Sequence, residues 1–222
     1  MDFIQTGYSE LDQALYGAIG VHGWEKGTIN LIRGTPGSYK SHLALTTCAE
    51  VTGSRGRVVY IDSDVSFDPV RAKDTGVCMD KCVVLTISDL TRVIDTLGQL
   101  TKINPPELLI LDSLLVGDPL GETRPASIWP SFLPKFGQWV RDNGVVVLAT
   151  APVRNNLQGI TIGDIAWQHQ SRVILHMPRP KQKGGEIVKP GGPYTFTLSE
   201  TSPLPVQEIL DPVLWDFPPW FG

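Results

Sequence analysis

The chain contains, at residues 34–41, the stretch Gly34-Thr35-Pro36-Gly37-Ser38-Tyr39-Lys40-Ser41. This stretch follows the phosphate-loop pattern G-x-x-x-x-G-K-[ST], except that tyrosine stands at position 39, where the pattern has glycine. In such a loop backbone N–H groups surround the phosphates, the lysine reaches the terminal phosphates and the hydroxyl binds magnesium. The stretch therefore predicts a nucleotide site with Lys40 at the phosphates and Ser41 at the metal.

The residues on either side of the loop support this interpretation. An apolar run from Thr28 to Ile32 precedes the loop, and a helix-forming run from Leu43 to Ala49 follows it. This order predicts a helix that begins near Lys40 and directs its positive N-terminal end at the phosphates. We expect all eight loop residues and the next one, His42, to contribute to nucleotide binding. The alternative is an ordinary glycine and proline turn between a strand and a helix.

Tyrosine at position 39 is the one departure within the loop. Glycine at this position usually supplies torsional freedom or room for the phosphate. The substitution therefore predicts an altered loop, a weaker nucleotide affinity, or an aromatic ring that forms a wall over the site.

Length and composition indicate one globular α/β domain. The chain has 222 residues, of which 41% are hydrophobic and 19% charged, enough for a full hydrophobic core. Its apolar runs are shorter than the roughly 18 residues that a membrane span requires, and residues 1–4 do not resemble a signal peptide. We therefore expect a cytoplasmic protein without a membrane partner.

Net charge and cysteine spacing bear on two further functions, nucleic-acid binding and zinc binding. The formal net charge of −4 argues against a broadly basic nucleic-acid binder, although an oligomer could still concentrate a few arginines along one axis. Cys78 and Cys82 are four residues apart, and no second cysteine or histidine pair follows to complete a zinc site. We therefore predict that these two residues and Cys48 are reduced, structural thiols.

Six short apolar runs rich in β-branched residues recur along the chain. They span residues 28–32, 58–61, 83–85, 108–111, 145–148 and 173–175, and residues 90–102 show helical spacing of apolar side chains. Near-continuous apolar strands that alternate with helices predict an α/β fold with a mostly parallel sheet covered on both faces. In such sheets ligands bind at the carboxyl ends of the strands.

Acidic residues follow two of these predicted strands. The run 58–61 leads into Asp62-Ser63-Asp64, and the run 108–111 leads into Asp112. An aspartate in the position of Asp112 presents its carboxylate to magnesium, directly or through water. A carboxylate at the end of an adjoining strand, such as Asp64, can orient and deprotonate an attacking water. Alone, either aspartate could instead cap a strand end.

The C-terminal segment has a different composition. Prolines are frequent after residue 200, and four of the last eight residues are aromatic. We predict a core over residues 1–200 and a tail over residues 201–222 with little regular structure. The aromatic end, residues 211–222, is expected to dock on its own domain or, alternatively, on a neighbouring subunit or a protein partner.

Beyond these motifs the chain resembles the RecA/RadA family of recombinase ATPases. The lead-in Thr6-Gly7-Tyr8-Ser9-Glu10-Leu11-Asp12 looks like the family pattern that precedes the phosphate loop. Residues 60–69 parallel, without a gap, a RecA segment that contains the catalytic glutamate and then an Asp-Pro pair that contacts adenine. The resemblance implies that Asp64 takes the place of the catalytic glutamate, and that Asp68 contacts adenine. It places Arg71 where the family has an aromatic that stacks on the base, a role that a guanidinium can also fill.

The resemblance extends over most of the chain and implies a RecA-like P-loop NTPase with a C-terminal antiparallel hairpin. Residues 109–114 look like the magnesium-site strand, and residues 149–154 look like the nucleotide-sensing strand end, where Pro152 replaces the usual glutamine. Residues 163–175 are similar to the segment that closes the second DNA-binding loop.

By the same resemblance, two loops would hold single-stranded DNA. One is 116–127, containing Arg124, and the other is 154–164, containing Arg154, Asn155, Asn156 and Gln158. Solvated loops are the alternative for both. In the turn 179–189, Lys181 and Lys183 would reach ATP bound to the next subunit, unless this turn is an exposed β-hairpin.

The family resemblance implies a DNA-dependent ATPase that uses ATP and Mg²⁺ and forms a homo-oligomeric ring or filament with ATP at subunit interfaces. The departures at Tyr39, Asp64 and Pro152 predict slow turnover. They also leave open a nucleotide-gated assembly or regulatory protein, and more weakly a helicase-like motor. The compact length resembles phage-encoded RecA-like proteins that assist single-strand annealing.

Overall fold

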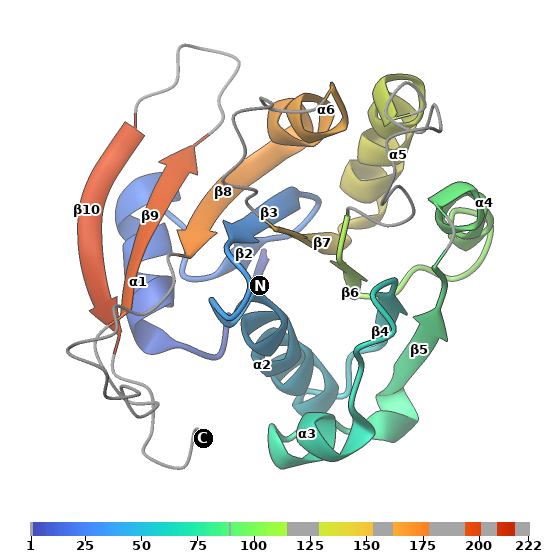
Figure 1. The fold of residues 1–222 in the computed structure, drawn as a ribbon, viewed down its shortest axis with the longest axis horizontal. Coiled ribbons are helices and arrows are strands. Elements are labelled where there is room, and N and C mark those ends of the chain that lie inside the picture. The colour runs from blue at the N-terminus through green and yellow to red at the C-terminus, as the bar shows by residue number, and fades with distance from the viewer. Residues whose placement is uncertain are drawn as a thin grey trace.

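An eight-stranded sheet forms the centre of the molecule (Figure 1). The computed structural model describes residues 2–88, 90–114, 129–152, 162–177, 194–200 and 208–215. The strands lie in the order β10-β9-β8-β3-β7-β6-β4-β5. Their bounds are β3 Ile29–Gly34, β4 Val58–Asp62, β5 Cys82–Thr86, β6 Leu108–Asp112, β7 Val146–Pro152, β8 Ser171–Met177, β9 Tyr194–Glu200 and β10 Glu208–Trp215. A separate two-stranded sheet pairs β1 Phe3–Ile4 with β2 Trp24–Glu25.

Six adjacent strands of the large sheet, from β8 to β5, are parallel. Each of them contains one of the six apolar runs found in the sequence. β9 and β10 extend the sheet as antiparallel strands next to β8. The predicted fold class, a RecA-like α/β fold with a mostly parallel sheet and antiparallel C-terminal strands, is therefore confirmed.

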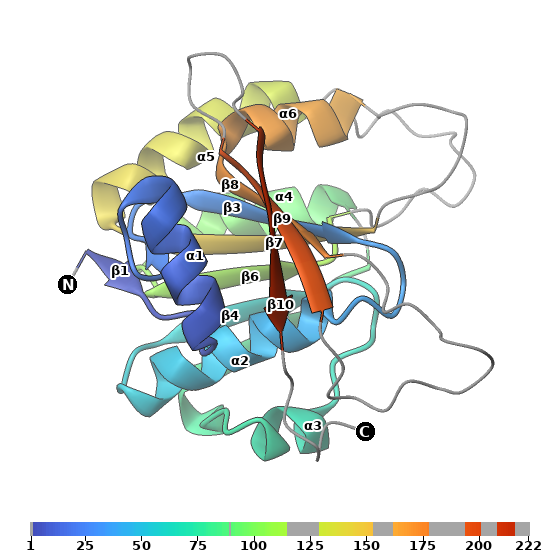
Figure 2. The ribbon, with the colours of Figure 1, turned by 90° about the vertical axis from the view of Figure 1, so that its left-hand side faces the viewer.

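Helices cover both faces of the parallel part of the sheet, as Figures 1 and 2 show. Their bounds are α1 Ser9–Ile19, α2 Lys40–Gly53, α3 Pro69–Asp74, α4 Leu90–Leu100, α5 Trp129–Asn143 and α6 Ile162–Gln170, and a short 3-10 turn spans Met79–Lys81. Leu108 and Ile110 of β6 join the core shared with α1, α2 and α3, whereas Leu109 and Leu111 join the core shared with α4, α5 and α6. Burial on both faces explains why these strands are continuously apolar.

The lead-in pattern around Thr6 anchors the N-terminal segment to α2. Gly7 has φ 87°, and a Cβ at this position would overlap the Thr46 side chain. The Thr6 N–H donates to the Asp12 carboxylate at 2.9 Å, and the Thr47 hydroxyl donates to the Thr6 carbonyl at 3.0 Å. The threonine, glycine and aspartate of this pattern therefore pack and hydrogen-bond the chain just before the phosphate loop.

Two predictions for irregular segments need correction. β10 spans residues 208–215 within the predicted tail and pairs with β9, so that the expectation of little regular structure is wrong there. Its pairing shifts register between Ile209 and Val213, on either side of Pro212, and a proline is tolerated at such an irregularity on an edge strand. The predicted loop 154–164 is also too long, because α6 begins at Ile162. The division into a core and a tail at residue 200 stays a prediction.

Several predicted segments lie outside the described residues. They are the loop 116–127, the first part of the loop 154–164, the turn 179–189 and the chain end after residue 215. Within the part of the chain that the structure describes, no helix combines the length and apolar character needed to cross a membrane.

The imidazole of His42 is buried within α2. Its Nε2 lies 3.1 Å from the Thr46 hydroxyl, one turn later. Burial, aided by the positive charge of Arg71, lowers the pKa of His42 from 6.5 to about 3. The unfolded chain takes up a proton here below pH 6.5, whereas the folded chain does so only near pH 3. Stability therefore falls as the pH decreases through this window.

We predict that the free energy of unfolding falls between pH 6.5 and pH 5, with His42 contributing up to about 1.4 kcal/mol per pH unit. His42→Gln should flatten this dependence because glutamine takes up no proton. Urea unfolding at a series of pH values measures the effect, with His169→Gln, an exposed position of α6, as the matched control. An unchanged slope in His42→Gln would contradict the burial of a neutral imidazole.

α2 begins directly after a residue in the left-handed conformation. Tyr39 has φ 64° and ψ 21°. A residue with a Cβ loses roughly 1–2 kcal/mol in this region, whereas glycine adopts it freely. The half-buried Tyr39 side chain packs against the core beneath α1 and α2, and this burial offsets part of the backbone cost.

Tyr39→Gly and Tyr39→Ala both remove the ring, but only glycine removes the backbone cost. We therefore predict that the glycine variant is more stable than the alanine variant by about 1 kcal/mol. Urea unfolding of both variants without nucleotide measures the difference. Equal stabilities would show that residue 39 is not held in the left-handed region.

Candidate functional site

The parallel register brings the predicted site residues to one edge of the sheet. Asp62 at the end of β4 is the direct partner of Asp112 at the end of β6. Gly34 at the end of β3 is paired with Pro152 at the end of β7. The phosphate loop, the acidic strand ends and the predicted sensor position therefore meet at the carboxyl ends of the strands, where ligands bind in such sheets.

The loop 34–41 is compact at its start. A Cβ added to Gly34 would overlap both the Ser38 hydroxyl and the Met177 carbonyl of the adjoining strand, so a larger residue does not fit. Gly37 has a positive φ of 79°, and the Ser38 N–H donates to the Thr35 carbonyl at 3.1 Å. Gly34, the first glycine of the pattern, is thus required by close packing, and Gly37, at a variable position of the pattern, by backbone conformation.

The N-terminus of α2 lies at the end of the phosphate loop, where an anion can bind. Tyr39 is the cap residue, and among the described residues its side chain makes no capping hydrogen bond to the helix. The first N–H groups of a helix have no partner within the helix, and together with the helix dipole they favour bound phosphate. Tyr39 thus holds the backbone conformation that glycine usually supplies at this position, with its ring packed to one side.

The ammonium of Lys40 lies inside the loop. Its Nζ donates to the Thr35 carbonyl at 3.1 Å and lies 3.5 Å from the Ser38 hydroxyl. Burial lowers the pKa of Lys40, and the charges of Asp112 and Asp64 oppose this shift. The ammonium of Lys40 therefore lies within electrostatic reach of Asp64, predicted to be catalytic, and of Asp112, predicted to bind the metal.

Asp112 is buried and held by two hydroxyl groups. It is 4% exposed; the Tyr60 hydroxyl donates to its Oδ2 at 2.5 Å, and the Thr150 hydroxyl donates to its Oδ1. Burial, followed by the Asp112 charge and hydrogen bond, raises the pKa of Tyr60 well above its ordinary value. The tyrosine therefore keeps its proton and remains a donor.

Asp64 is held from the neighbouring strand end. The Ser113 hydroxyl donates to Asp64 Oδ1 at 3.2 Å. Partial burial raises the pKa of Asp64; the Ser113 hydrogen bond and the Lys40 charge oppose this, and the charges of Asp112 and Asp62 add to it. A raised pKa makes the carboxylate a better proton acceptor.

Asp62 organises the turn that carries Asp64. Its carboxylate accepts hydrogen bonds from the N–H groups of Ser66 at 3.1 Å and Phe67 at 2.9 Å. Val65, between these groups and Asp64, has φ 54°, which is uncommon for a β-branched residue. The sequence contains Asp62 in the acidic cluster but offers no signal that it serves the turn rather than the ligand.

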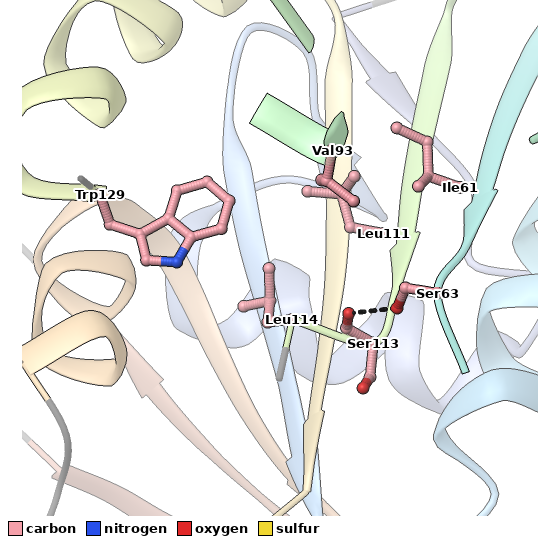
Figure 3. Close-up of a pocket in the computed structure, with 7 residues that line it drawn as sticks. All are labelled: Ile61, Ser63, Val93, Leu111, Ser113, Leu114 and Trp129. Atoms are coloured by element: carbon pink, nitrogen blue, oxygen red, sulfur yellow. Dashed lines mark hydrogen bonds between the residues drawn. The ribbon is translucent and has the colours of Figure 1, made fainter. Parts of the chain in front are cut away.

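Two serines join the strand ends beneath Asp64. The Ser63 hydroxyl donates to the Ser113 carbonyl at 2.6 Å, and Figure 3 shows this bond beside a small cavity. Apolar side chains line the rest of the cavity, which has a volume of about 10 Å³ and is too small for a nucleotide. This part of the site therefore supports the carboxylates.

The three residues predicted beyond the loop occupy distinct positions. Asp68 caps α3, because its Oδ1 accepts the Val70 N–H at 2.8 Å. Arg71 lies in α3, and its charge lowers the pKa of His42 and opposes the rise in the pKa of Tyr8. The His42 side chain is buried in the protein, which leaves its backbone N–H as the group that can reach a phosphate. Contacts of these residues with a nucleotide stay predictions.

The donor set fits magnesium better than a transition metal. Within the described residues no three His, Cys, Asp or Glu side chains cluster as a metal site, and the cysteines are free thiols. Magnesium bound with nucleotides typically takes one or two protein ligands and completes its shell with phosphates and water. Ser41 and Asp112 match that requirement.

Other predicted contacts fall outside the described residues. These are the DNA-binding candidates Arg124, Arg154, Asn155 and Asn156, and the predicted contacts Lys181 and Lys183 to the next subunit's ATP.

Comparison with known proteins identifies relatives of this site and fold. The family model of the RecA N-terminal domain matches residues 1–123, more than half of the chain. Protein RecA of Mesomycoplasma hyopneumoniae (strain 7448) is 26% identical over 167 residues, which cover 71% of this chain and 49% of that protein. Protein RecA of Clostridium perfringens (strain 13 / Type A) is 34% identical over 122 residues, which cover 55% of this chain and 34% of that protein.

The match to the family model includes the lead-in, the phosphate loop and both acidic strand ends. The chain spans about half or less of the length of the two RecA relatives named above. With the parallel sheet and the loop geometry described above, these matches show that the chain belongs to the RecA family.

Proposed function

We propose that the chain is an ATP-dependent, single-stranded DNA-binding protein that acts in homologous recombination, single-strand annealing or repair and hydrolyses ATP slowly with magnesium. The observation that supports this most strongly is the meeting of the phosphate loop with the ends of β4 and β6 at one edge of the sheet, where the hydroxyl of Ser113, the residue after Asp112, donates to Asp64. The named RecA relatives provide the link to recombination and DNA.

Lys40, Ser41, Asp112 and Asp64 each have a role in this proposal. Lys40 and the loop N–H groups hold the phosphates, and Ser41 and Asp112 hold magnesium, which neutralises charge on the phosphates when bound. Asp64 orients the attacking water and accepts its proton, which requires a carboxylate that is unprotonated but basic.

Besides Tyr39, two departures from the family pattern favour slow turnover. Asp64 has one methylene fewer than the glutamate of the family, and Ser113 holds it toward the end of β6. Pro152, paired with Gly34, has no side-chain group with which to sense the terminal phosphate. Displacement of a catalytic group by about 1 Å can reduce the rate roughly a hundredfold.

DNA binding and assembly complete the proposal. Loops around Arg124 and around Arg154, Asn155 and Asn156 would grip single-stranded DNA, and Lys181 and Lys183 would contact ATP on the next subunit of a ring or filament. The C-terminal residues 211–222 would contact their own domain, as residues 211–215 do where β10 pairs with β9, or alternatively a neighbouring subunit or a protein partner.

A nucleotide-gated assembly or regulatory protein is the second candidate. The short Asp64 side chain and Pro152 favour it, because both weaken hydrolysis without removing a group that holds the phosphates. In that function ATP binding switches subunit contacts, and little hydrolysis occurs.

The test combines DNA binding with turnover. We predict that fluorescence anisotropy of labelled single-stranded DNA rises on adding the protein with magnesium and a non-hydrolysable ATP analogue, and that DNA stimulates phosphate release from ATP. Absence of both ATP binding and nucleotide-dependent DNA binding would refute the proposal.

Asp64→Asn separates the two candidates, because the amide is similar in size but accepts no proton. In the ATPase, phosphate release should fall at least about a hundredfold while nucleotide-dependent DNA binding is kept. Asp80→Asn, in the exposed turn before β5, is the matched control. Unchanged function of Asp64→Asn in cells would favour the regulatory switch.

A further inference from the structure

Two hydroxyl groups hold the buried carboxylate of Asp112 from opposite sides. β6, which carries Asp112, lies between β4 and β7. Tyr60 of β4 donates to Oδ2 at 2.5 Å, and Thr150 of β7 donates to Oδ1. Since each oxygen has its own donor on its own neighbouring strand, rotation of the carboxylate would break both hydrogen bonds.

The hydroxyl groups of Tyr60 and Thr150 lie in an otherwise apolar part of the core. Tyr60 and Thr150 are 2% and 0% exposed, and the strand residues paired around them on this face, such as Ile110 and Leu148, are apolar and buried. Phenylalanine and valine would fill the same space without a buried polar group. The two hydroxyls are therefore not needed to fill the core, and their shared acceptor is Asp112.

The two hydrogen bonds leave part of the carboxylate available. An ionised carboxylate has about four lone-pair positions, and the two donors occupy one on each oxygen. Counting donors from the described residues, one position on each oxygen remains for a cation or for water bound to it. The donors therefore fix the carboxylate without saturating it.

Tyr60 also connects this carboxylate to the turn that carries Asp64. Its ring meets Phe67 edge to face, with centroids 4.9 Å apart. The N–H of Phe67 in turn donates to Asp62 at 2.9 Å. One buried side chain thus contacts both the carboxylate and the adjoining turn.

Building on the proposed function, we propose that Tyr60 and Thr150 are positioning residues that hold Asp112 in its magnesium-binding orientation. Partners that orient a metal ligand typically change metal affinity by tenfold to a hundredfold when they are removed. The phosphate loop itself makes no part of this arrangement, so its metal-independent hold on the nucleotide should be unaffected.

The experiment titrates magnesium into each protein with a fluorescent non-hydrolysable ATP analogue and records binding rather than turnover. In Tyr60→Phe and Thr150→Val the magnesium concentration for half-maximal binding should rise about tenfold or more. Thr150→Ser keeps the hydroxyl and should stay near the wild-type value. Tyr16→Phe, at a tyrosine that is 53% exposed, controls for loss of a phenol. Binding of the analogue in EDTA should be equal in all of them.

The possible results distinguish the positioning of Asp112 by Tyr60 and Thr150 from nucleotide binding by the phosphate loop. Wild-type magnesium midpoints in Tyr60→Phe and Thr150→Val would overturn the positioning role while leaving the nucleotide site intact. A weakening of binding in EDTA equal to that in magnesium would also overturn it, because the defect would then be general. If Tyr60→Phe does not fold, the Thr150→Val and Thr150→Ser pair decides. Wild-type binding that is independent of magnesium would reject both this role and the proposed function.

Discussion

The register of the parallel strands is the constraint on which the site depends. It pairs Asp62 with Asp112 and Gly34 with Pro152, so that loops leaving different strands meet at one edge. A slip of one residue would turn every side chain of a strand to the opposite face. Because both faces of β4, β6 and β7 are buried, such a slip would exchange residues between two packed cores. Core packing therefore fixes the register and, with it, the geometry of the site.

The phosphate loop shows that a tyrosine can occupy a left-handed backbone conformation that glycine adopts freely. Tyr39 stays in the left-handed region, and its side chain packs against the core below α1 and α2. Gly34 cannot be replaced by a larger residue, because the Ser38 hydroxyl and the Met177 carbonyl occupy the space that a Cβ would need. The two positions of one pattern therefore tolerate change differently: one requires a backbone conformation and the other requires empty space.

Periodicity and motif spacing predicted the parts of the structure that repeat or that follow a strand directly. The six parallel strands were predictable because burial on both faces makes them continuously apolar, and the edge position of Asp64 and Asp112 followed from the strand ends. The helical segment 129–143 was not predicted, and it contains Pro134, which usually argues against a helix interior. β10 was missed for the same reason, since Pro212 lies within it.

The support around the carboxylates could not be predicted from the sequence. In the sequence Tyr60 resembles the apolar residues around it in the strand. Its hydrogen-bond acceptor, Asp112, is 52 positions further along the chain. Thr150 and Ser113 likewise acquire their partners only when strands that are distant in sequence become neighbours. These contacts depend on register, which the order of strands in the sequence does not specify.

The central claim is that residues 34–41 hold the phosphates of a nucleotide despite the tyrosine at position 39. Isothermal titration calorimetry with magnesium and a non-hydrolysable ATP analogue, applied to the wild type and to Lys40→Ala, tests it most directly. We predict saturable binding to the wild type and at least about tenfold weaker binding to Lys40→Ala, because a charge-assisted contact is lost. Urea unfolding without nucleotide checks that Lys40→Ala is folded. No saturable heat in the wild type, or equal affinities of the two proteins, would contradict the claim.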